Sequence, residues 1–479
     1  MNGAMIVYTV GMMLKVEAAL MCLPLAVSLF YRESPWAFLV TIFLLLAFGT
    51  LMTVRRPEKD TIYAKEGFFI VGLSWIFLSV FGALPFVFSR EIPNFVDALF
   101  ETISGFTTTG ASILTDVEAM SRGMLFWRSF THWVGGMGVL VFVLAVLPKS
   151  DAQTLYIMKA EVPGPTCGKL VARVRHTAMI LYGIYLAMTV ILVILLLIGG
   201  MPLFDSVLHA FGTAGTGGFG IKATSIGYYN SVYFDYVIGI FMMLFGINFN
   251  LYYYLLLGDV VSVFKSEELR WYLGIIVAAT LLIALNILPI YGGFGTSVRY
   301  AFFQVSSIIT TTGYTTADYA LWPGFSQTIL VMIMFIGAMA GSTGGGIKVS
   351  RIVVLAKSAW RELCTMRSPR MVRTIRLEGK PLDKQTGAGI YAFLTAYLLL
   401  FALSVLLLAL DQQDHVSNFT AVAACVNNIG PALGACGPMG SFAPFNALSK
   451  LVLSFDMLAG RLEIFPMLML FAPSSYRRK

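Results

Sequence analysis

Apolar runs of about 20 residues, long enough for an α-helix to cross a bilayer, recur along the whole chain. Clear examples lie at residues 179–198, 236–257 and 391–410. Two more such runs, at 5–30 and 36–54, open the chain. We interpret the first as a retained helix, because it is too long for a signal peptide and no small-residue cleavage site precedes the next run. The pattern predicts an all-α integral membrane protein.

After the two opening helices, one pattern occurs four times. It consists of a long apolar helix, a half-length amphipathic segment, a turn of Gly, Thr or Asn, and another long apolar helix. The half-length segments are too brief to span a bilayer, so we interpret them as re-entrant helices. They lie at residues 94–106, 205–214, 298–309 and 417–426. Repetition at roughly 100 residues indicates duplicated structural units.

This repetition divides the chain into five parts. We expect a transmembrane helix pair at 1–60 and pore repeats at 61–150, 151–262, 263–384 and 385–479. The third repeat would contain an intramembrane gate loop and a basic cytosolic segment. The expected fold is therefore two N-terminal helices followed by four helix–pore-loop–helix repeats around a pseudo-fourfold pore.

The four turns carry a glycine at the same place, namely Gly110, Gly218, Gly313 and Gly430. Non-helical backbone at membrane depth is tolerated only where it is buried in protein or lines a water-filled cavity. Four such turns in one chain converge most simply on a single axis. An ordinary glycine-rich loop is the alternative for any single turn, but it does not account for four turns in the same setting.

A ring of backbone carbonyls from four loops can replace the water shell of a cation. Glycine allows the backbone conformations that such a ring requires. The turns contain no Asp or Glu, so a carboxylate ring of the Ca²⁺ type is disfavoured. With one glycine per turn, we expect fewer well-formed sites than in a TVGYG filter and weaker rejection of Na⁺. The candidate filter residues are Thr108, Thr109, Gly110, Thr216, Gly217, Gly218, Thr311, Thr312, Gly313, Asn428, Ile429 and Gly430.

A second glycine-rich stretch interrupts the last apolar run of the third repeat. Each interior glycine costs a helix about 1 kcal/mol relative to Ala. We therefore predict a flexible gate below the filter; the alternative is a close crossing of two helices at small residues. The candidate gate residues are Gly341, Ser342, Thr343, Gly344, Gly345, Gly346 and Lys348.

Single charges also occur within apolar runs. Arg461 lies in the run 451–471, and such charges usually face a bundle interior or water. Arg461 is therefore either a positive barrier to cations or part of a structural ion pair. Glu101 either holds the filter from behind or attracts cations at its mouth. Arg128 and His132, one helical turn apart, are interpreted as interfacial or structural.

Composition supports a membrane protein. Apolar and aromatic residues make up 58% of the chain and charged residues 12%, against about 25% charged residues in soluble domains. Mean hydropathy is +0.80. Lipid must therefore cover much of the surface, and a soluble enzyme is excluded.

The net charge of +8 is unevenly placed. Under the positive-inside rule, the basic loops lie in the cytoplasm together with both chain termini. We interpret these loops as a topology signal and expect no nucleic-acid binding. The basic residues are Arg55, Arg56, Lys59, Lys65, Lys149, Lys159, Lys169, Arg173, Arg175, Lys265, Arg270, the stretch 348–384 and the tail 477–479.

The Cys and His residues of the sequence do not form the patterns typical of metal or redox sites. The five Cys residues form no CxxC pair, and none of the four His residues pairs with another at helical metal-binding spacing. This argues against a disulfide or zinc framework and against haem or copper. We expect no cofactor, only a transported ion.

The four turns resemble those of the Trk/Ktr/HKT superfamily of potassium transporters, most closely its bacterial TrkH branch. The opening helix pair is similar to that of the TrkH type. Residues 340–348 resemble the intramembrane loop of the family. Residues 460–465 resemble its fourth-repeat motif, whose Arg obstructs the pore, so the resemblance favours the barrier and assigns Arg461 to the gate. In the superfamily, Ser at the first filter glycine tends to accompany Na⁺ passage, so Gly110 favours K⁺. The fourth filter departs most from the others, with Asn427, Asn428 and Pro431.

The resemblance implies K⁺ uptake, with Rb⁺ also accepted, through a gated, channel-like pore in the bacterial inner membrane. Membrane potential drives inward movement by about 2.3 kcal/mol per charge per 100 mV. The resemblance further implies a homodimer and a cytosolic nucleotide-binding RCK regulatory subunit (TrkA-like), for which the basic stretch 361–384 is a plausible docking surface. Alternatives are a Na⁺ or weakly selective cation pathway and a proton-coupled secondary transporter. A membrane enzyme is disfavoured.

Overall fold

The computed structural model describes residues 2–57, 64–136, 138, 174–368 and 374–471. Several sequence-based predictions fall outside these residues. They are the expected repeat boundaries at 60/61 and 150/151 and the basic residues Lys59, Lys149, Lys159, Lys169, Arg173 and 477–479.

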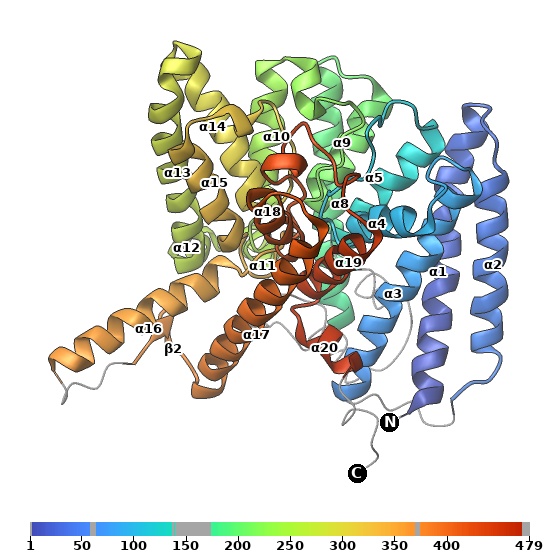
Figure 1. The fold of residues 1–479 in the computed structure, drawn as a ribbon. Coiled ribbons are helices and arrows are strands. Elements are labelled where there is room, and N and C mark those ends of the chain that lie inside the picture. The colour runs from blue at the N-terminus through green and yellow to red at the C-terminus, as the bar shows by residue number, and fades with distance from the viewer. Residues whose placement is uncertain (1, 58–63, 137, 139–173, 369–373, 472–479) are drawn as a thin grey trace.

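The protein is a bundle of helices that run between two ends of the molecule (Figure 1). The opening pair is α1 (Gly3–Phe30) and α2 (Trp36–Thr53). The first helices of the repeats are α3 (Ala64–Phe88), α8 (Val174–Ile198), α13 (Glu267–Tyr291) and α17 (Lys384–Leu408). The short helices are α4 (Phe95–Phe106), α9 (Leu203–Gly215), α14 (Phe294–Ile309) and α18 (His415–Val426). This order confirms the predicted all-α class of two helices followed by four repeats.

The second helices of the repeats are shorter or interrupted. They are α5 (Arg122–Gly136), α10 (Val232–Phe245) with α11 (Phe249–Leu256), α15 (Gly324–Ile336) with α16 (Val349–Arg367), and α19 (Ala447–Arg461) with α20 (Phe465–Phe471). The remaining elements are α12 (Val260–Lys265), the 3₁₀ turns η1 (Ser225–Tyr229), η2 (Tyr319–Leu321), η3 (Ala409–Asp411) and η4 (Gly434–Cys436), and a hairpin of β1 (Arg376–Leu377) and β2 (Lys380–Pro381).

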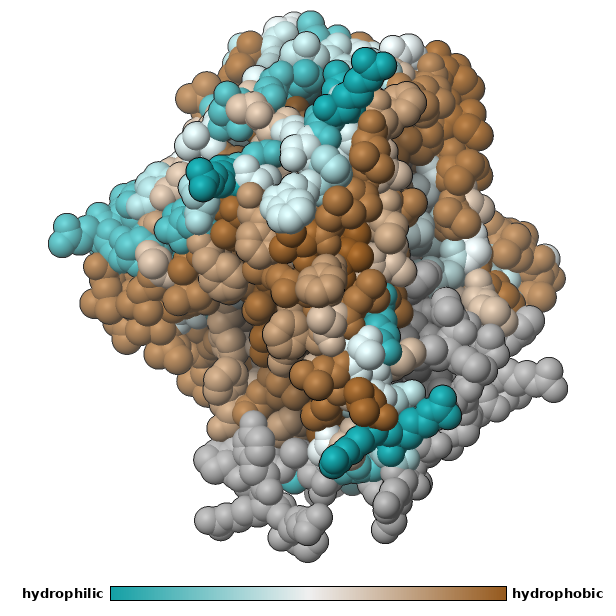
Figure 2. Space-filling model, turned by 90° about the vertical axis from the view of Figure 1, so that its right-hand side faces the viewer, coloured by the Kyte–Doolittle hydropathy of each residue, from teal (hydrophilic) through white to brown (hydrophobic). Residues whose placement is uncertain are grey.

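The outer surface is apolar. Phe43, Ile198 and Leu399 are 68–72% exposed on three different long helices. Figure 2 shows a broad hydrophobic band between hydrophilic groups at the two ends of the molecule. In the described part of the chain, six helices are long and apolar enough to cross a membrane, or seven if the bent pair α10–α11 is one span. The protein is therefore a multi-pass membrane protein.

One predicted span is wrong in detail. The apolar run 236–257 is not one straight helix, because α10 and α11 meet at an angle of 92°. Gly246 follows α10, where a Cβ atom would lie 2.4 Å from the Tyr272 hydroxyl. Asn248 then caps α11 by accepting from the Asn250 N–H at 2.9 Å. A polar cap and a crowded glycine thus end a helix that hydropathy alone extends.

The run 451–471 is also interrupted, since α19 ends at Arg461 and α20 begins at Phe465. The expected interruption of the third repeat is present, because residues 337–348 separate α15 from α16. The short helix α14 begins four residues before its predicted start, directly after Gly293. The helix α18 begins two residues early because Asp414 caps it, accepting from the Ser417 N–H at 3.1 Å.

The opening helices cross closely at two glycines. A Cβ atom on Gly49 would lie 2.9 Å from the carbonyl oxygen of Gly11, and one on Gly11 would lie 2.7 Å from the Met52 Cβ. Small residues at a helix crossing let the two backbones approach closely. In lipid, where the hydrophobic effect does not drive helices together, this close packing stabilises the pair.

We expect Gly49→Leu to lower the melting temperature of the purified protein by several degrees, because overpacking a tight contact costs about 1–3 kcal/mol. Gly183 on α8 is the matched control, since a Cβ atom there would meet nothing within 4 Å. Thermal unfolding in detergent checks the prediction. Equal melting temperatures for Gly49→Leu and Gly183→Leu would contradict it.

Candidate ion pathway

Each short helix ends directly at one of the glycine turns. The last helical residues are Phe106, Gly215, Ile309 and Val426. The C-terminus of a helix carries roughly half a negative elementary charge. Four such ends beside the turns create a negative potential there, which favours a cation over an anion.

The four turns share one backbone conformation. In each, the residue two positions before the glycine has a positive φ between 55° and 61°, and the glycine has a φ between 72° and 92°. In each, the N–H just before the glycine donates to a carbonyl five residues earlier, at 2.8–2.9 Å. The positive-φ pairs are Thr108 and Gly110, Thr216 and Gly218, Thr311 and Gly313, and Asn428 and Gly430. The fourth turn therefore has the same backbone shape despite its different side chains.

The turns also contact each other in a closed cycle. A Cβ atom added to any of the four glycines would clash with the backbone of the next turn, within 1.8–2.6 Å of a carbonyl oxygen. That oxygen always belongs to the residue just before the neighbouring glycine. The contacts run from Gly110 to Gly217, Gly218 to Thr312, Gly313 to Ile429, and Gly430 to Thr109. The predicted filter residues are thus brought together around one centre.

A cavity of about 310 Å³ adjoins this ring, and all four glycines line it. Two cationic side chains, Arg128 and Lys222, also line the cavity. Lys222 donates to Glu118 at 3.0 Å, and this hydrogen bond lowers the pKa of Glu118 and raises that of Lys222. Arg128 pairs with Glu101, so each positive charge beside the ring has a carboxylate partner.

A buried ion pair supports the first two turns from behind. Glu101 accepts from Arg128 at 2.6 Å and from the Ser112 hydroxyl and Ile113 N–H at 2.9 Å each. Arg128 also donates to the Gly220 carbonyl at 2.9 Å and lies 3.5 Å from the centre of the Phe219 ring. Glu101 is 1% exposed and Arg128 3%. Of the alternatives for Glu101, the structure favours support of the filter, and Arg128 is structural rather than interfacial.

The second and fourth turns have further supports. The His132 ring stacks on Phe219 at 4.1 Å and closes the space beside Gly217. Tyr397 donates to the Asn427 side chain at 3.0 Å. Asn428 donates to the Thr109 hydroxyl and to the Met457 carbonyl, each at 2.9 Å. The two asparagines of the fourth turn thus tie it to the first turn and to the helices α17 and α19.

The predicted gate loop contacts the second, third and fourth repeats directly and is linked to the first through Arg461. Thr343 donates to the Phe245 carbonyl of the second repeat at 3.1 Å. The Gly345 N–H donates to the Thr311 hydroxyl of the third filter turn at 2.7 Å, and a Cβ atom on Gly345 would lie 2.5 Å from the Asn427 carbonyl of the fourth. The Thr343 carbonyl accepts from Arg461 at 2.7 Å. A short segment can contact three repeats only near their common axis, next to the four glycine turns.

Arg461 connects the loop to the first repeat. It donates to the Thr343 carbonyl and, at 2.7 Å, to the Gly136 carbonyl at the end of α5. Its partners in the described part of the chain therefore include backbone carbonyls. The next residues are strained: Glu463 and Ile464 have positive φ values of 57° and 67°, which is unfavourable above all for a β-branched residue.

The remaining gate residues hold the loop to the start of α11 and to itself. The Gly341 carbonyl accepts from the Phe249 N–H at 3.0 Å, and the Ser342 hydroxyl donates to Met339. Gly346 packs against Gly337 at a distance that leaves no room for a Cβ atom. The Lys348 ammonium donates to the Gly344 carbonyl, and Lys348 itself has a positive φ of 86°.

The comparisons with known proteins agree with this architecture. The sequence profile of the TrkH family, described as "Cation transport protein", matches residues 35–478. The chain belongs to the TrkH family. The family is one of transporters rather than enzymes.

Among the TrkH-family relatives, the "Trk system potassium uptake protein TrkH" of Salmonella typhimurium is 39% identical over 98% of each chain. The protein of the same name from Escherichia coli K12 is 38% identical over 98% of each chain. The "Crystal Structure of the Potassium Transporter TrkH from Vibrio parahaemolyticus" matches with a TM-score of 0.89 and 34% identity, over 100% of each chain.

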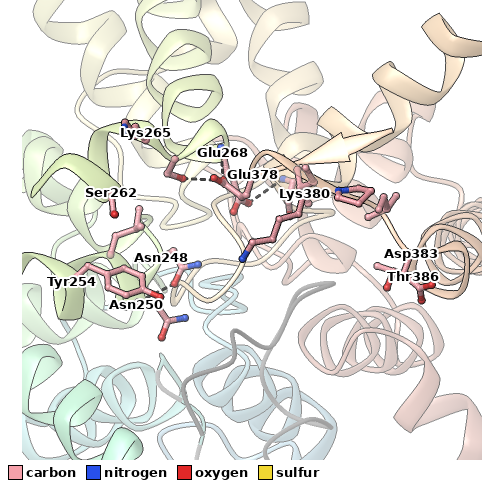
Figure 3. A pocket seen from close by; sticks show the side chains of 16 residues that line it. Asn248, Asn250, Tyr254, Ser262, Lys265, Glu268, Glu378, Lys380, Asp383 and Thr386 are labelled. Atoms are coloured by element: carbon pink, nitrogen blue, oxygen red, sulfur yellow. Dashed lines mark hydrogen bonds between the residues drawn. The ribbon is translucent and has the colours of Figure 1, made fainter. Parts of the chain in front are cut away.

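Tyr397 and Glu268 belong to this TrkH-family site but were not indicated by the sequence. Glu268, near the start of α13 and at the wall of the cavity in Figure 3, accepts from the Ala340 N–H at 2.8 Å and from the Ser350 N–H at 3.0 Å. It therefore holds both ends of the gate loop. The sequence does not indicate this role of Glu268, because the residue lies 72 positions before Ala340 and its neighbours predict only the start of a helix.

Arg128→Met tests the support of the first two turns. It leaves the Glu101 charge buried without its partner, which typically costs about 3–5 kcal/mol, so we expect a marked fall in melting temperature. The double variant Glu101→Gln with Arg128→Met should recover much of the loss. Lys222→Met is the control, because its partner Glu118 is 42% exposed and such pairs contribute about 0–1 kcal/mol. A double variant no more stable than Arg128→Met would contradict the interpretation.

Proposed function

We propose that this chain takes up K⁺, and also Rb⁺, through a gated, channel-like pore driven by membrane potential. The closed cycle of four glycine turns is the observation that carries the proposal. Four carbonyl-bearing turns around one centre suit the dehydration of a monovalent cation. The four helix C-termini add a favourable negative potential, and the relatives carry the name "Trk system potassium uptake protein".

We assign the selectivity filter to the twelve residues predicted above, three in each turn. K⁺ as cargo would pass the filter residues, with no further cofactor. The glycine at each turn is required for two reasons: it has a positive φ, and a neighbouring carbonyl occupies the space of a Cβ atom. Gly110 in the first turn supports K⁺ rather than Na⁺ as the main substrate.

We assign the gate to Gly341–Gly346, Lys348 and Arg461. A loop that lies beside the filter, contacts three repeats directly and is linked to the first through Arg461 would obstruct ion flow. Arg461 adds a positive charge beside it. Opening would require the loop to leave its contacts with Thr311, Phe245 and Arg461. Glycines lower the conformational cost of that movement.

We propose a bacterial inner-membrane location with cytoplasmic termini, based on the basic loops. The word "system" in the names of the relatives supports an assembly of several subunits. A cytosolic nucleotide-binding RCK subunit (TrkA-like) would bind near the basic stretch 361–384, and two copies of this chain would form a homodimer. Helix α16 projects from the bundle (Figure 1) and exposes Trp360, Leu363 and Met366 by 60–72%, which supports a protein contact there. The division into five parts is proposed with the bounds given above.

Gly313→Ser should abolish growth of a K⁺-uptake-deficient bacterium at low K⁺ and reduce ⁸⁶Rb⁺ influx at least tenfold. The physical reason is that a Cβ atom would lie 2.1 Å from the Ile429 carbonyl oxygen. Gly183→Ser is the matched control, because its site on α8 is open, and should support growth like the parent. Full rescue by Gly313→Ser would overturn the filter assignment, and competition by Na⁺ equal to that by K⁺ would favour the weakly selective alternative.

Arg461→Met should raise ⁸⁶Rb⁺ influx into proteoliposomes severalfold, because the Thr343 carbonyl of the loop loses its hydrogen bond from a charged group, worth about 1.5–3 kcal/mol, and the loop loses its link to α5. Arg270→Met is the control: Arg270 also donates to backbone carbonyls, those of Ser266 and Lys265, but contacts none of the gate residues in the described structure. An unchanged or reduced influx in Arg461→Met, with normal protein yield, would argue against a barrier role.

A further inference from the structure

The four glycine turns share one backbone shape but differ in two side chains, those one and three positions before the glycine. These positions hold Thr107 and Thr109 in the first turn, Gly215 and Gly217 in the second, Thr310 and Thr312 in the third, and Asn427 and Ile429 in the fourth. In the first and third turns the two threonine hydroxyl oxygens lie 2.8 Å apart. The second and fourth turns cannot form such a pair, because neither has a hydroxyl at these positions.

Each hydroxyl pair continues into the short helix that precedes it. Thr107, the cap residue of α4, donates to the Ile103 carbonyl at 2.7 Å. Thr310, the cap residue of α14, donates to the Ser306 carbonyl at 2.6 Å. A hydroxyl has a single proton, so within each pair the threonine next to the glycine must be the donor. The result is a directed hydrogen-bond chain from the turn to the end of its helix.

These chains are shielded from water. Thr107, Thr109, Thr310 and Thr312 are all 0% exposed. A buried hydroxyl that loses its partner has no water to replace it, which makes the loss costly. Each chain therefore resists any movement of its turn away from the helix.

The chains end at residues whose carbonyls form the ring. The Thr109 carbonyl oxygen would lie 2.6 Å from a Cβ atom on Gly430, and that of Thr312 1.8 Å from one on Gly218. The contacts between neighbouring turns run in the order first, second, third, fourth and back to the first, so the first and third turns lie opposite each other. A hydrogen bond that fixes the rotamer of a threonine also restricts its backbone. Two opposite sides of the ring are thus braced in the same way.

The other two sides are braced by different means. A Cβ atom on Gly217 would lie 2.3 Å from the His132 ring, which fills the space behind the second turn. In the fourth turn the Asn427 amide donates to the Ala423 carbonyl at 2.8 Å, but Ile429 has no hydroxyl to continue the chain. The support of the ring is therefore twofold rather than fourfold.

We propose that Thr107 and Thr310 are positioning residues for K⁺ selectivity, which hold the carbonyls of Thr109 and Thr312 at the spacing that suits K⁺. This inference rests on the proposed function. Na⁺ is smaller than K⁺, so carbonyl oxygens must move closer together to replace its water shell. That movement pulls the first and third turns toward the centre and stretches the hydroxyl chains. Neither Thr107 nor Thr310 contacts the ion; each acts through the threonine two positions later.

Thr107→Val and Thr310→Val remove the hydroxyl and keep nearly the same side-chain shape. The purified full chain is placed in proteoliposomes, and the ratio of ²²Na⁺ to ⁸⁶Rb⁺ influx is measured. We expect the ratio to rise about threefold in each single variant and about tenfold, or ~1.4 kcal/mol, in the double variant. The effects should multiply, because the two chains lie in opposite turns and share no partner.

Two kinds of control separate the hydroxyl chain from a general loss of packing. Thr102 on α4 is also buried and donates to a carbonyl four residues earlier, that of Ala98 at 2.8 Å. Its hydroxyl bonds to no glycine turn in the described structure, so Thr102→Val should leave the influx ratio unchanged. Thr107→Ser and Thr310→Ser keep the hydroxyl and should restore the ratio of the parent.

An unchanged ratio in the double Val variant, with measurable ⁸⁶Rb⁺ influx and a parent that prefers Rb⁺, would overturn this inference alone. An equal rise in Thr102→Val or in the Ser variants would overturn it as well. If the double variant yields no folded protein, each single variant decides the question, because each has its own expected increase. A parent that passes Na⁺ as readily as Rb⁺ would overturn the proposed selectivity itself, and this inference with it, so the two failures give different results.

Discussion

A cation that gives up its water inside a membrane needs fixed oxygens around it, and the structure depends on the close approach of four turns that bear such oxygens. Each glycine lies so near the carbonyl of the next turn that no side chain fits between them. The supports behind the turns follow from this constraint. Backbone that is not helical must be held by other groups, and Glu101, Arg128, Tyr397 and Asn428 supply the hydrogen bonds.

The sequence predicted the ring because its signals are local and repeated. A glycine after a half-length apolar segment can be recognised in the sequence. Because this pattern occurs four times, it predicts a fourfold arrangement of the turns. The run of glycines within an apolar stretch indicated the gate loop, and the family resemblance favoured the barrier role of Arg461, which periodicity does not identify. The break after α10 was missed because Gly246 and Asn248 are ordinary residues in an apolar run. Only the folded chain shows Tyr272 crowding Gly246 and Asn248 capping α11.

Contacts between residues far apart in the sequence could not be predicted either, because they depend on how the chain folds. Arg128 contacts the backbone of Gly220, 92 residues later, and Glu268 holds a loop that begins 72 residues after it. The chemistry of a lone Arg or Glu is compatible with a lipid interface, a pore mouth or a buried support. Only the folded chain selects among these, because the choice depends on which backbone donors and acceptors surround the charge.

The fourth turn shows what a single polypeptide allows. In an assembly of four identical subunits, any change in the filter would appear in all four quadrants at once. Here each turn has its own stretch of sequence and can change independently. Asn428 occupies a position where the other three turns have Thr, yet it keeps the same positive φ. The Asn428 side-chain amide also donates to the Thr109 hydroxyl of the neighbouring turn. A threonine at this position has no amide group to make that bond. Gene duplication followed by divergence can thus adjust one side of an ion pathway while the other three keep its geometry.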